Sequence, residues 1–175
     1  LISSNLQSLK ILVFGNSYSR DALMYLPYII ESIAAVDVKI GILYHANCTL
    51  EDHYLRITNE ISYDAYDKYD GGGSAWKTEK NTSGRSLANK ALKDEDWDVV
   101  TLQQGSKKSR DYSSYQPYLD TIIDIIKEKI GKPIKFGWIM TPAYADGYSG
   151  LLGSTSDAMY SDIVACTRRV LDETA

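Results

Sequence analysis

Ser17 is the side chain of this sequence that is best placed to do chemistry. It comes shortly after an apolar run at residues 11–14, which predicts a strand buried on both faces of a sheet. Gly15 breaks the run, and apolar residues then recur at helical spacing up to Ile33. A serine between a central strand and a helix N-terminus lies where backbone N–H groups favour an anion or a developing oxyanion. The same position suits a serine that only caps the helix, so nucleophile and helix cap are both open interpretations.

A second set of polar side chains follows the strand predicted at residues 37–44. This segment contains His45, Asn47 and Cys48, and Thr49 with an acidic residue three positions later predicts a helix N-terminus. In a parallel sheet this junction lies at the same edge as the junction after the first strand. His45 is therefore a candidate base for the first-strand serine, with a structural or substrate-contacting role as the alternative.

His53 raises the question of a metal site, because two acidic residues, Glu51 and Asp52, come just before it. Residues two apart on a helix do not face one another, so His53 and Glu51 make a poor chelate. The two cysteines, Cys48 and Cys166, have neither metal-ligand nor disulfide spacing and are expected to be buried free thiols. We therefore expect no metal ion and no other cofactor.

The alternation of strands and helices predicts the fold class. Two further strands are expected at residues 97–104, a segment that ends in Gln103 and Gln104, and at 134–140. Further helices are expected at residues 83–93, 115–130 and 156–173. The pattern indicates an α/β fold with a mostly parallel sheet, helices on both faces and right-handed crossovers. A glycine run flanked by aromatic residues predicts a small β-hairpin at 61–81, inserted outside the main sheet.

Length and charge limit the classes of function. The 175 residues suit a single domain, and a net charge of -4 with a pI near 5.2 supplies no basic surface for a nucleic acid. No apolar run approaches the roughly 20 residues that cross a bilayer, so no membrane partner is expected. The 14 tyrosines suit either a wet, sugar-like ligand or a half-exposed surface. An exposed sheet edge favours pairing with another chain, so a homodimer is one expected assembly.

Three ordered blocks of sequence carry a resemblance to a known family. They are Gly-Asn-Ser-Tyr-Ser at 15–19, Cys-Thr-Leu-Glu-Asp-His at 48–53, and Trp-Asp-Val-Val-Thr-Leu-Gln-Gln-Gly-Ser at 97–106. Together they resemble the SGNH (GDSL-like) hydrolase superfamily, and most closely its branch in which the first block reads Gly-Asn-Ser. The resemblance implies a three-layer α/β/α flavodoxin-like fold and a serine ester hydrolase that removes acyl or acetyl groups from a carbohydrate. The same resemblance implies a secreted or periplasmic location.

The resemblance also implies roles for particular residues. Ser17 matches the nucleophile, and its backbone N–H matches one oxyanion donor. The turn around Asn47 and Cys48 matches the block that supplies a second N–H, and Gln104, with Gln103 as its rival, matches the amide side chain that is the third donor. Preorganised donors of this kind are each worth on the order of 3 kcal/mol in the transition state. Substrate contacts are expected from the side chains near these residues, namely Asn16, His45, Cys48 and Gln103.

The chain departs from the superfamily pattern in two places. Ala46 and Asn47 stand where the branch commonly has glycines, which predicts an altered loop. The last block of the superfamily, Asp-x-x-His near the C-terminus, is absent, and a serine without a base is a poor nucleophile. We therefore expect the general base to lie outside this chain, with residues 1–175 forming one domain truncated at its C-terminus. The alternative function is a catalytically inactive glycan-binding or structural module on the same fold.

Overall fold

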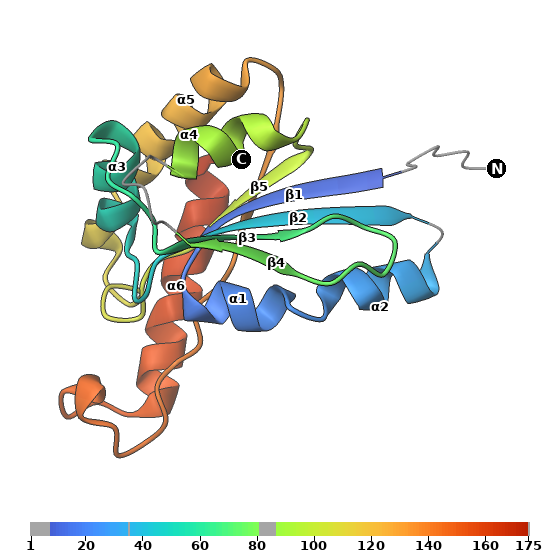
Figure 1. Cartoon of the computed structure of the whole chain (residues 1–175). Helices are drawn as coiled ribbons and strands as arrows, with labels where there is room; N and C mark the ends of the chain where they lie inside the picture. Colours follow the sequence, from blue (N-terminus) through green and yellow to red (C-terminus); the bar gives the residue numbers. More distant parts are fainter. Residues whose placement is uncertain (1–7, 35, 81–86, 175) are drawn as a thin grey trace.

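One six-stranded sheet organises the part of the chain that the computed structural model describes, residues 8–34, 36–80 and 87–174 (Figure 1). The strands are β1 (Ser8–Gly15), β2 (Asp37–Tyr44), β3 (Ala65–Tyr69), β4 (Lys77–Lys80), β5 (Val99–Leu102) and β6 (Lys135–Trp138). Their order across the sheet is β4-β3-β2-β1-β5-β6. β1 is therefore an inner strand, and the complete burial of Leu12, Val13 and Phe14 confirms the prediction of a strand covered on both faces.

The strands β2, β1, β5 and β6 run parallel, as the alternation of elements predicts. β3 and β4 form the predicted hairpin, but its position differs from the prediction. β3 pairs antiparallel with β2, from Ile40 opposite Tyr69 to Tyr44 opposite Ala65, so the hairpin extends the main sheet instead of lying outside it. The physical reason is burial: most side chains of β3, including Tyr66, are covered when the strand pairs at this edge.

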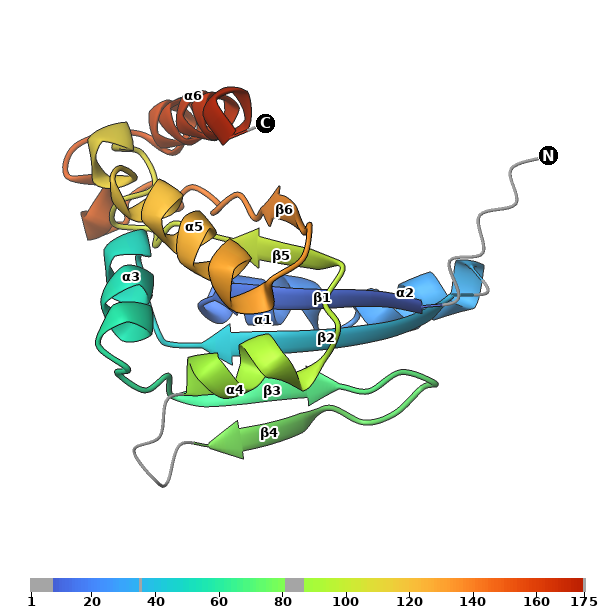
Figure 2. The same cartoon turned by 90° about the horizontal axis from the view of Figure 1, so that it is seen from above.

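The helices form two layers around the sheet (Figure 1 and Figure 2). α1 (Ser17–Leu23) and α2 (Leu26–Ile33) cover one face, and α3 (Leu50–Thr58), α4 (Leu87–Asp94) and α5 (Tyr118–Ile130) cover the other. α6 (Ser156–Thr174) lies beyond β6 in Figure 2, and its Cys166 and Val170 join the apolar cluster that includes the buried face of α5. Two short 3-10 turns, Tyr112–Ser114 and Ser149–Leu151, interrupt the loops.

Two helix boundaries differ from the prediction because of proline. The first predicted helix is two helices, since α1 ends at Leu23 and Pro27 lies in the first turn of α2. Proline has no N–H to donate and clashes with the preceding turn, so it starts a helix more readily than it continues one. α5 likewise begins directly after Pro117, and it ends at Ile130, where Gly131 with a φ of 70° caps the helix as expected. The predicted start of the helix at 83–93 falls on residues 81–86, which lie outside the described residues.

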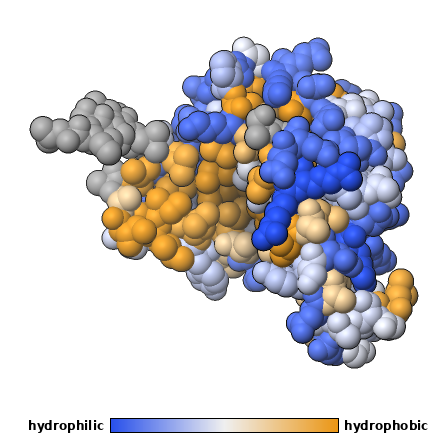
Figure 3. Space-filling view, turned by 180° about the vertical axis from the view of Figure 1, so that it is seen from behind, coloured by the Kyte–Doolittle hydropathy of each residue, from blue (hydrophilic) through white to orange (hydrophobic). Residues whose placement is uncertain are grey.

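Two apolar clusters hold the sheet between its layers. The larger lies under α3, α4 and α5 and includes Trp97 and Tyr63, and the smaller lies under α1 and α2 and includes Val13 and Ile42. The outer side of α2 is also apolar: Ile33 is 80% exposed, and the view from behind shows an apolar area over this part of the molecule (Figure 3). The clusters fix β1, β2 and β5, whose carboxyl ends form the edge on which the candidate site lies.

Candidate functional site

Ser17 is the first residue of α1, and its side chain is exposed. The neighbouring Asn16, only 2% exposed, is the residue that caps the helix. Its Oδ1 accepts from the Tyr18 backbone N–H at 3.1 Å, and its Nδ2 donates to the Cys48 carbonyl at 3.3 Å. Within the described part of the chain the Ser17 hydroxyl has no hydrogen-bond partner. Asn16, and not Ser17, is therefore the cap of α1, and the Ser17 hydroxyl is not used in capping.

Gln103 reaches the same turn from the end of β5. Ser19 is fully buried, and its hydroxyl donates to Oε1 of Gln103 at 2.6 Å. This bond fixes the amide, whose Nε2 is buried and has no hydrogen-bond partner among the described residues. Gly15 permits the arrangement, because a Cβ at that position would lie 2.2 Å from the Ser19 hydroxyl oxygen. The turn that carries Ser17 is therefore tied through Ser19 to a buried amide whose N–H group has no protein acceptor among the described residues.

Gln104 points to the other side of the sheet and its amide is fully engaged. Its Oε1 accepts from the backbone N–H groups of Leu50 and Gly105, both at 2.9 Å. Its Nε2 donates to the carbonyl and hydroxyl oxygens of Ser114, at 3.3 and 3.1 Å. The side chain therefore ties the loop after β5 to the start of α3. Of the two glutamines, Gln103 is the one whose side-chain Nε2 has no hydrogen-bond partner among the described residues.

The loop after β2 closes against the loop after β5. A Cβ on Gly105 would lie 2.9 Å from the Cys48 carbonyl oxygen and 3.0 Å from that of Asn47. Asn47 is exposed and has a φ of 55°, the left-handed conformation that asparagine tolerates better than most residues. This explains how the loop keeps a left-handed turn without a glycine. Thr49 and Asp52 form the predicted capping box at the start of α3.

His45 faces α3 and Asp64. Its Nε2 lies 2.6 Å from a guanidinium nitrogen of Arg56, and its Nδ1 lies 2.9 Å from Oδ1 of Asp64. Arginine only donates, so Nε2 is the acceptor and the ring proton lies on Nδ1. Tyr44, the preceding residue, lines the opposite side of the sheet. The structure therefore brings the His45 backbone to the site, where its N–H donates to the Gly15 carbonyl, but directs the ring elsewhere.

His53 is a fully buried member of the core beneath α3. Its Nδ1 lies 2.9 Å from the Tyr63 hydroxyl, and its ring stacks on Tyr63 and meets the edge of Phe14. Burial lowers the pKa of His53 from 6.5 to about 3. The imidazole is therefore neutral in the folded protein at ordinary pH.

We expect His53 to make folding stability fall as the pH drops from 6.5 to about 4.5. In this range the unfolded chain binds a proton at His53 that the folded chain does not, because the folded pKa is about 3. Above pH 6.5 the neutral His53 costs the folded protein no stability. Below this pH the free energy of unfolding falls by up to about 1.4 kcal/mol per pH unit. Urea titrations at several pH values measure the slope. His53→Gln, which cannot titrate, should lack this component, and equal slopes in the two proteins would contradict the assignment.

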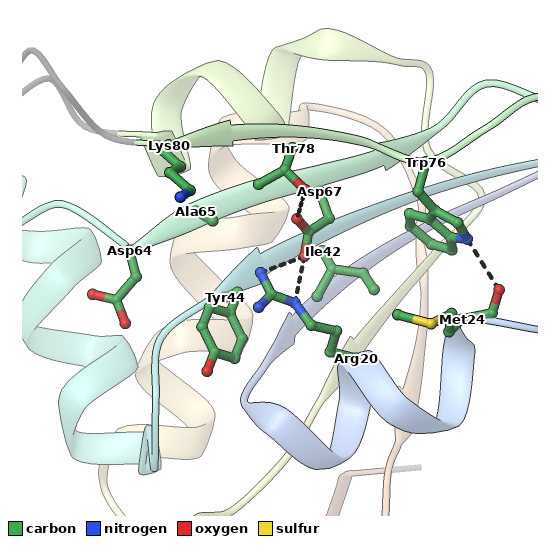
Figure 4. A pocket seen from close by; sticks show the side chains of 10 residues that line it. All are labelled: Arg20, Met24, Ile42, Tyr44, Asp64, Ala65, Asp67, Trp76, Thr78 and Lys80. Atoms are coloured by element: carbon green, nitrogen blue, oxygen red, sulfur yellow. Dashed lines mark hydrogen bonds and ion pairs between the residues drawn. The ribbon is translucent and has the colours of Figure 1, made fainter.

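A cavity of about 470 Å³ opens between α1 and the β3–β4 hairpin (Figure 4). Its lining includes Arg20, Met24, Ile42, Tyr44, Asp67 and Trp76. Arg20 contacts Asp67 through Nε at 2.7 Å and through a terminal nitrogen at 2.6 Å. The sequence reasoning missed this cavity. The available signal was the spacing of Ser17, Arg20 and Met24, which is that of one helix face.

Three further observations on the described residues concern metal ligands, helix length and the thiols. They contain no group of three or more His, Cys, Asp or Glu side chains that could hold a metal ion. None of their helices is both long and apolar enough to cross a bilayer. Cys48 and Cys166 are free and buried, as expected, and burial raises the pKa of the Cys48 thiol well above its ordinary range. Cys48 therefore contributes its backbone carbonyl to the site, and its protonated thiol is a poor nucleophile.

Two solved structures are similar to this chain. The crystal structure of a DUF4886 family protein from Bacteroides uniformis matches 94% of the chain with 31% identity and a TM-score of 0.83. The match covers 63% of that protein, so this chain spans less than two thirds of its length. A protein from Slackia heliotrinireducens, described as "a putative SGNH hydrolase", matches 96% of this chain and 77% of its own, with 18% identity and a TM-score of 0.59.

The similarity to the protein from Slackia heliotrinireducens concerns the fold alone. This chain has an α/β fold that resembles that structure, which agrees with the sequence-based expectation. No match was found among curated proteins. The model of the DUF4886 family, a domain of unknown function, matches residues 10–172, which include nearly all of the sheet and both helical layers. The chain therefore belongs to the DUF4886 family.

Proposed function

We propose that this chain carries the nucleophile and oxyanion donors of an SGNH-type serine ester hydrolase, which removes acyl or acetyl groups from a carbohydrate. The observation that carries the proposal is the state of Ser17. It stands exposed at the carboxyl end of an inner parallel strand with its hydroxyl free, while Asn16 supplies the helix cap. Ligands of open α/β sheets bind at this edge.

In the proposed reaction, the Ser17 Oγ attacks the ester carbonyl carbon while its proton passes to a general base. The carbonyl oxygen becomes an oxyanion, and we assign its donors as the backbone N–H groups of Ser17 and Asn47 and the Nε2 of Gln103. The tetrahedral intermediate collapses, and the sugar hydroxyl leaves with the proton that the base holds. Water then attacks the acyl-serine, which releases the carboxylic acid and regenerates Ser17.

The hydrogen bonds around the turn support this choice of donors. Gln103 has a buried Nε2 without a partner among the described residues, whereas Gln104 would have to give up its bonds to Ser114 to serve as the amide donor. The Cys48 N–H already donates to the His45 carbonyl at 3.3 Å. Asn47 is therefore the better candidate for the backbone donor in the loop after β2.

We place the general base outside these 175 residues. The sequence has two histidines, and neither ring is available to Ser17: His45 is held by Arg56 and Asp64, and His53 is buried against Tyr63. The family member from Bacteroides uniformis is longer than the region that matches this chain. A block of the Asp-x-x-His type, as the SGNH resemblance implies, would supply the missing base.

Covalent labelling of the full-length protein tests the proposal. A p-nitrophenyl phosphonate reacts with a base-activated serine, so it should add its phosphonyl group to Ser17, as detected by mass spectrometry of tryptic peptides. Arg20 separates Ser17 from Ser32 after digestion, and Ser32, an exposed serine of α2, should stay unmodified. Folded full-length protein that leaves Ser17 unmodified, under conditions that label a standard serine esterase completely, would overturn the proposal.

A glycan-binding module without turnover is the second candidate function. It is favoured by the aromatic side chains of Tyr44 and Trp76 in the cavity and by the orientation of His45 away from Ser17. This function predicts saturable binding of an oligosaccharide in calorimetry with no release of acid. Binding heats at the level of buffer dilution across a panel of glycans would count against it.

A further inference from the structure

The cavity between α1 and the β3–β4 hairpin is lined by residues that follow Ser17 on α1. Arg20 and Met24 line it and follow Ser17 at spacings of three and seven residues, so all three lie on one side of α1. On the sheet, Tyr44 lines the cavity and is the register partner of Gly15, two residues before Ser17. Figure 4 shows Arg20 and Met24 of the α1 segment facing Tyr44 and Ile42 of β2 across the cavity, so its Arg20–Tyr44 end is the end toward Ser17 and Gly15.

The inner surface of the cavity is apolar. Ile42 and Ala65, 1% and 5% exposed, contribute side chains from the sheet, and Met24 and Trp76 contribute the facing walls. Trp76 is held in place, because its Nε1 donates to the Met24 carbonyl at 3.0 Å and its ring packs on Tyr69 with centroids 5.7 Å apart. The one polar atom of the indole is thus already satisfied, and the wall that it forms is apolar.

Two of the charged side chains that line the cavity, Arg20 and Asp67, form an ion pair with each other. Oδ2 of Asp67 accepts a hydrogen bond from Arg20 Nε and forms an ion pair with a terminal nitrogen of the same guanidinium, and Oδ1 accepts from the Thr78 hydroxyl at 2.7 Å. The Arg20 guanidinium also lies 3.6 Å from the centre of the Tyr44 ring. The other two charged lining residues, Lys80 and Asp64, are exposed, and Asp64 lies 2.9 Å from His45 Nδ1 and accepts from the Ala46 backbone N–H at 3.1 Å. The inner part therefore offers no unpaired charge to an ionic ligand and few free hydrogen-bonding groups to a sugar, whereas an uncharged apolar group gains by leaving water.

We propose that this cavity receives the acyl chain of the ester, and that the chain is uncharged, apolar and longer than acetyl. The inference rests on the proposed function, because it takes Ser17 as the group that attacks the ester carbonyl. With the carbonyl at Ser17, the chain extends past Arg20 and Met24 toward Ile42 and Ala65. A cavity of about 470 Å³ is within the range of small-molecule sites and exceeds what an acetyl methyl fills.

Binding of neutral amides tests the inference without any chemical step. Octanamide and acetamide are titrated into the Ser17→Ala full-length protein, and the NMR signal of the Trp76 indole N–H is followed. Octanamide should shift this signal saturably and bind at least tenfold more tightly than acetamide. Equal affinity for the two amides, or an unmoved Trp76 signal at saturating octanamide, would overturn the inference.

Two cavity variants and one surface control locate the binding in the cavity. Ala65→Phe fills it and should weaken octanamide binding at least tenfold, whereas Ala158→Phe adds the same ring at an exposed position of α6 and should not. Met24→Glu covers the case in which Ala65→Phe does not fold: Met24 is 41% exposed, and a carboxylate there should also weaken the binding of an apolar chain. Unchanged affinity in both cavity variants would contradict the proposal.

The binding experiment and the labelling of Ser17 can fail independently, so the acyl pocket and the hydrolase proposal are tested separately. Phosphonate labelling of Ser17 together with an octanamide that does not bind would leave the hydrolase proposal standing and overturn the acyl pocket. Octanamide binding in a protein whose Ser17 is never labelled would overturn the hydrolase and, with it, the acyl role of the cavity. Saturable shifts of the Trp76 signal with xylobiose and none with octanamide would assign the cavity to a glycan instead.

Discussion

Replacing Ser17 by alanine is expected to lower ester hydrolysis by the full-length protein at least about 10³-fold. The variant loses the oxygen that forms the acyl intermediate, while the oxyanion donors and the cavity keep their positions. The fold should be unaffected, because the Ser17 side chain is exposed and Asn16 caps α1. Release of p-nitrophenol from p-nitrophenyl acetate measures the activity, and the midpoint of urea unfolding measures the fold.

Two further variants sharpen this test. Ser32→Ala removes an exposed hydroxyl that donates to the Ile29 carbonyl in α2, and it should leave hydrolysis unchanged. Ser17→Cys keeps a nucleophile at the position and should form an acyl-enzyme that mass spectrometry detects. Hydrolysis by Ser17→Ala within a factor of ten of the unmodified protein would exclude Ser17 as the nucleophile.

Replacing Trp97 by alanine should lower the free energy of unfolding by about 3–5 kcal/mol. The indole is fully buried, and its Nε1 donates to the Ala91 carbonyl of α4 at 2.8 Å. Gly41 in β2 makes room for it, since a Cβ there would lie 2.9 Å from a carbon of the Trp97 ring. Alanine would therefore leave a cavity between β2 and α4 and an unsatisfied carbonyl at the end of that helix.

Urea unfolding followed by circular dichroism measures this loss. Trp97→Phe should cost less than alanine, because it keeps most of the buried ring and loses the N–H. Trp76→Ala is the matched control: Trp76 is only partly buried, at the rim of the smaller cluster, so its loss should be well below that of Trp97. Equal effects at Trp76 and Trp97 would contradict the assignment of Trp97 to the structural centre of the fold.

The parallel part of the fold could be predicted from the sequence, because its signals are local. β2 has the bounds of its prediction at residues 37–44, and the capping box of Thr49 and Asp52 gives the start of α3. Local signals could not predict where the hairpin lies in the sheet. The pairing of β3 with β2 depends on which side chains become buried when the two strands meet. Pro27 marked the break between α1 and α2, but the apolar periodicity across it favoured one helix.

The sequence places the candidate residues at the ends of strands but does not show which way their side chains point. Gln103 and Gln104 are adjacent at the end of β5, so their side chains point to opposite faces, one to Ser19 and the other to Leu50. Tyr44 and His45 divide in the same way between the cavity and α3. The register of the whole sheet decides which residue of each pair faces α1. A sequence motif contains both residues and does not distinguish between the two faces. Whether these residues catalyse a reaction stays a prediction.

The long-range bonds of the Ser17 turn also bear on the order of folding. Asn16 and Cys48 are 32 residues apart in the sequence, and Ser19 and Gln103 are 84 apart. Contacts that close such long loops are slow to form, because the entropy of closure is lost before pairing compensates for it. A nascent chain with β1, α1 and β2 in place would carry Ser17 and lack the Gln103 amide. Under the proposed function, the full set of oxyanion donors would therefore assemble only after β5 has paired with β1, and hydrolysis would in addition wait for the general base outside these 175 residues.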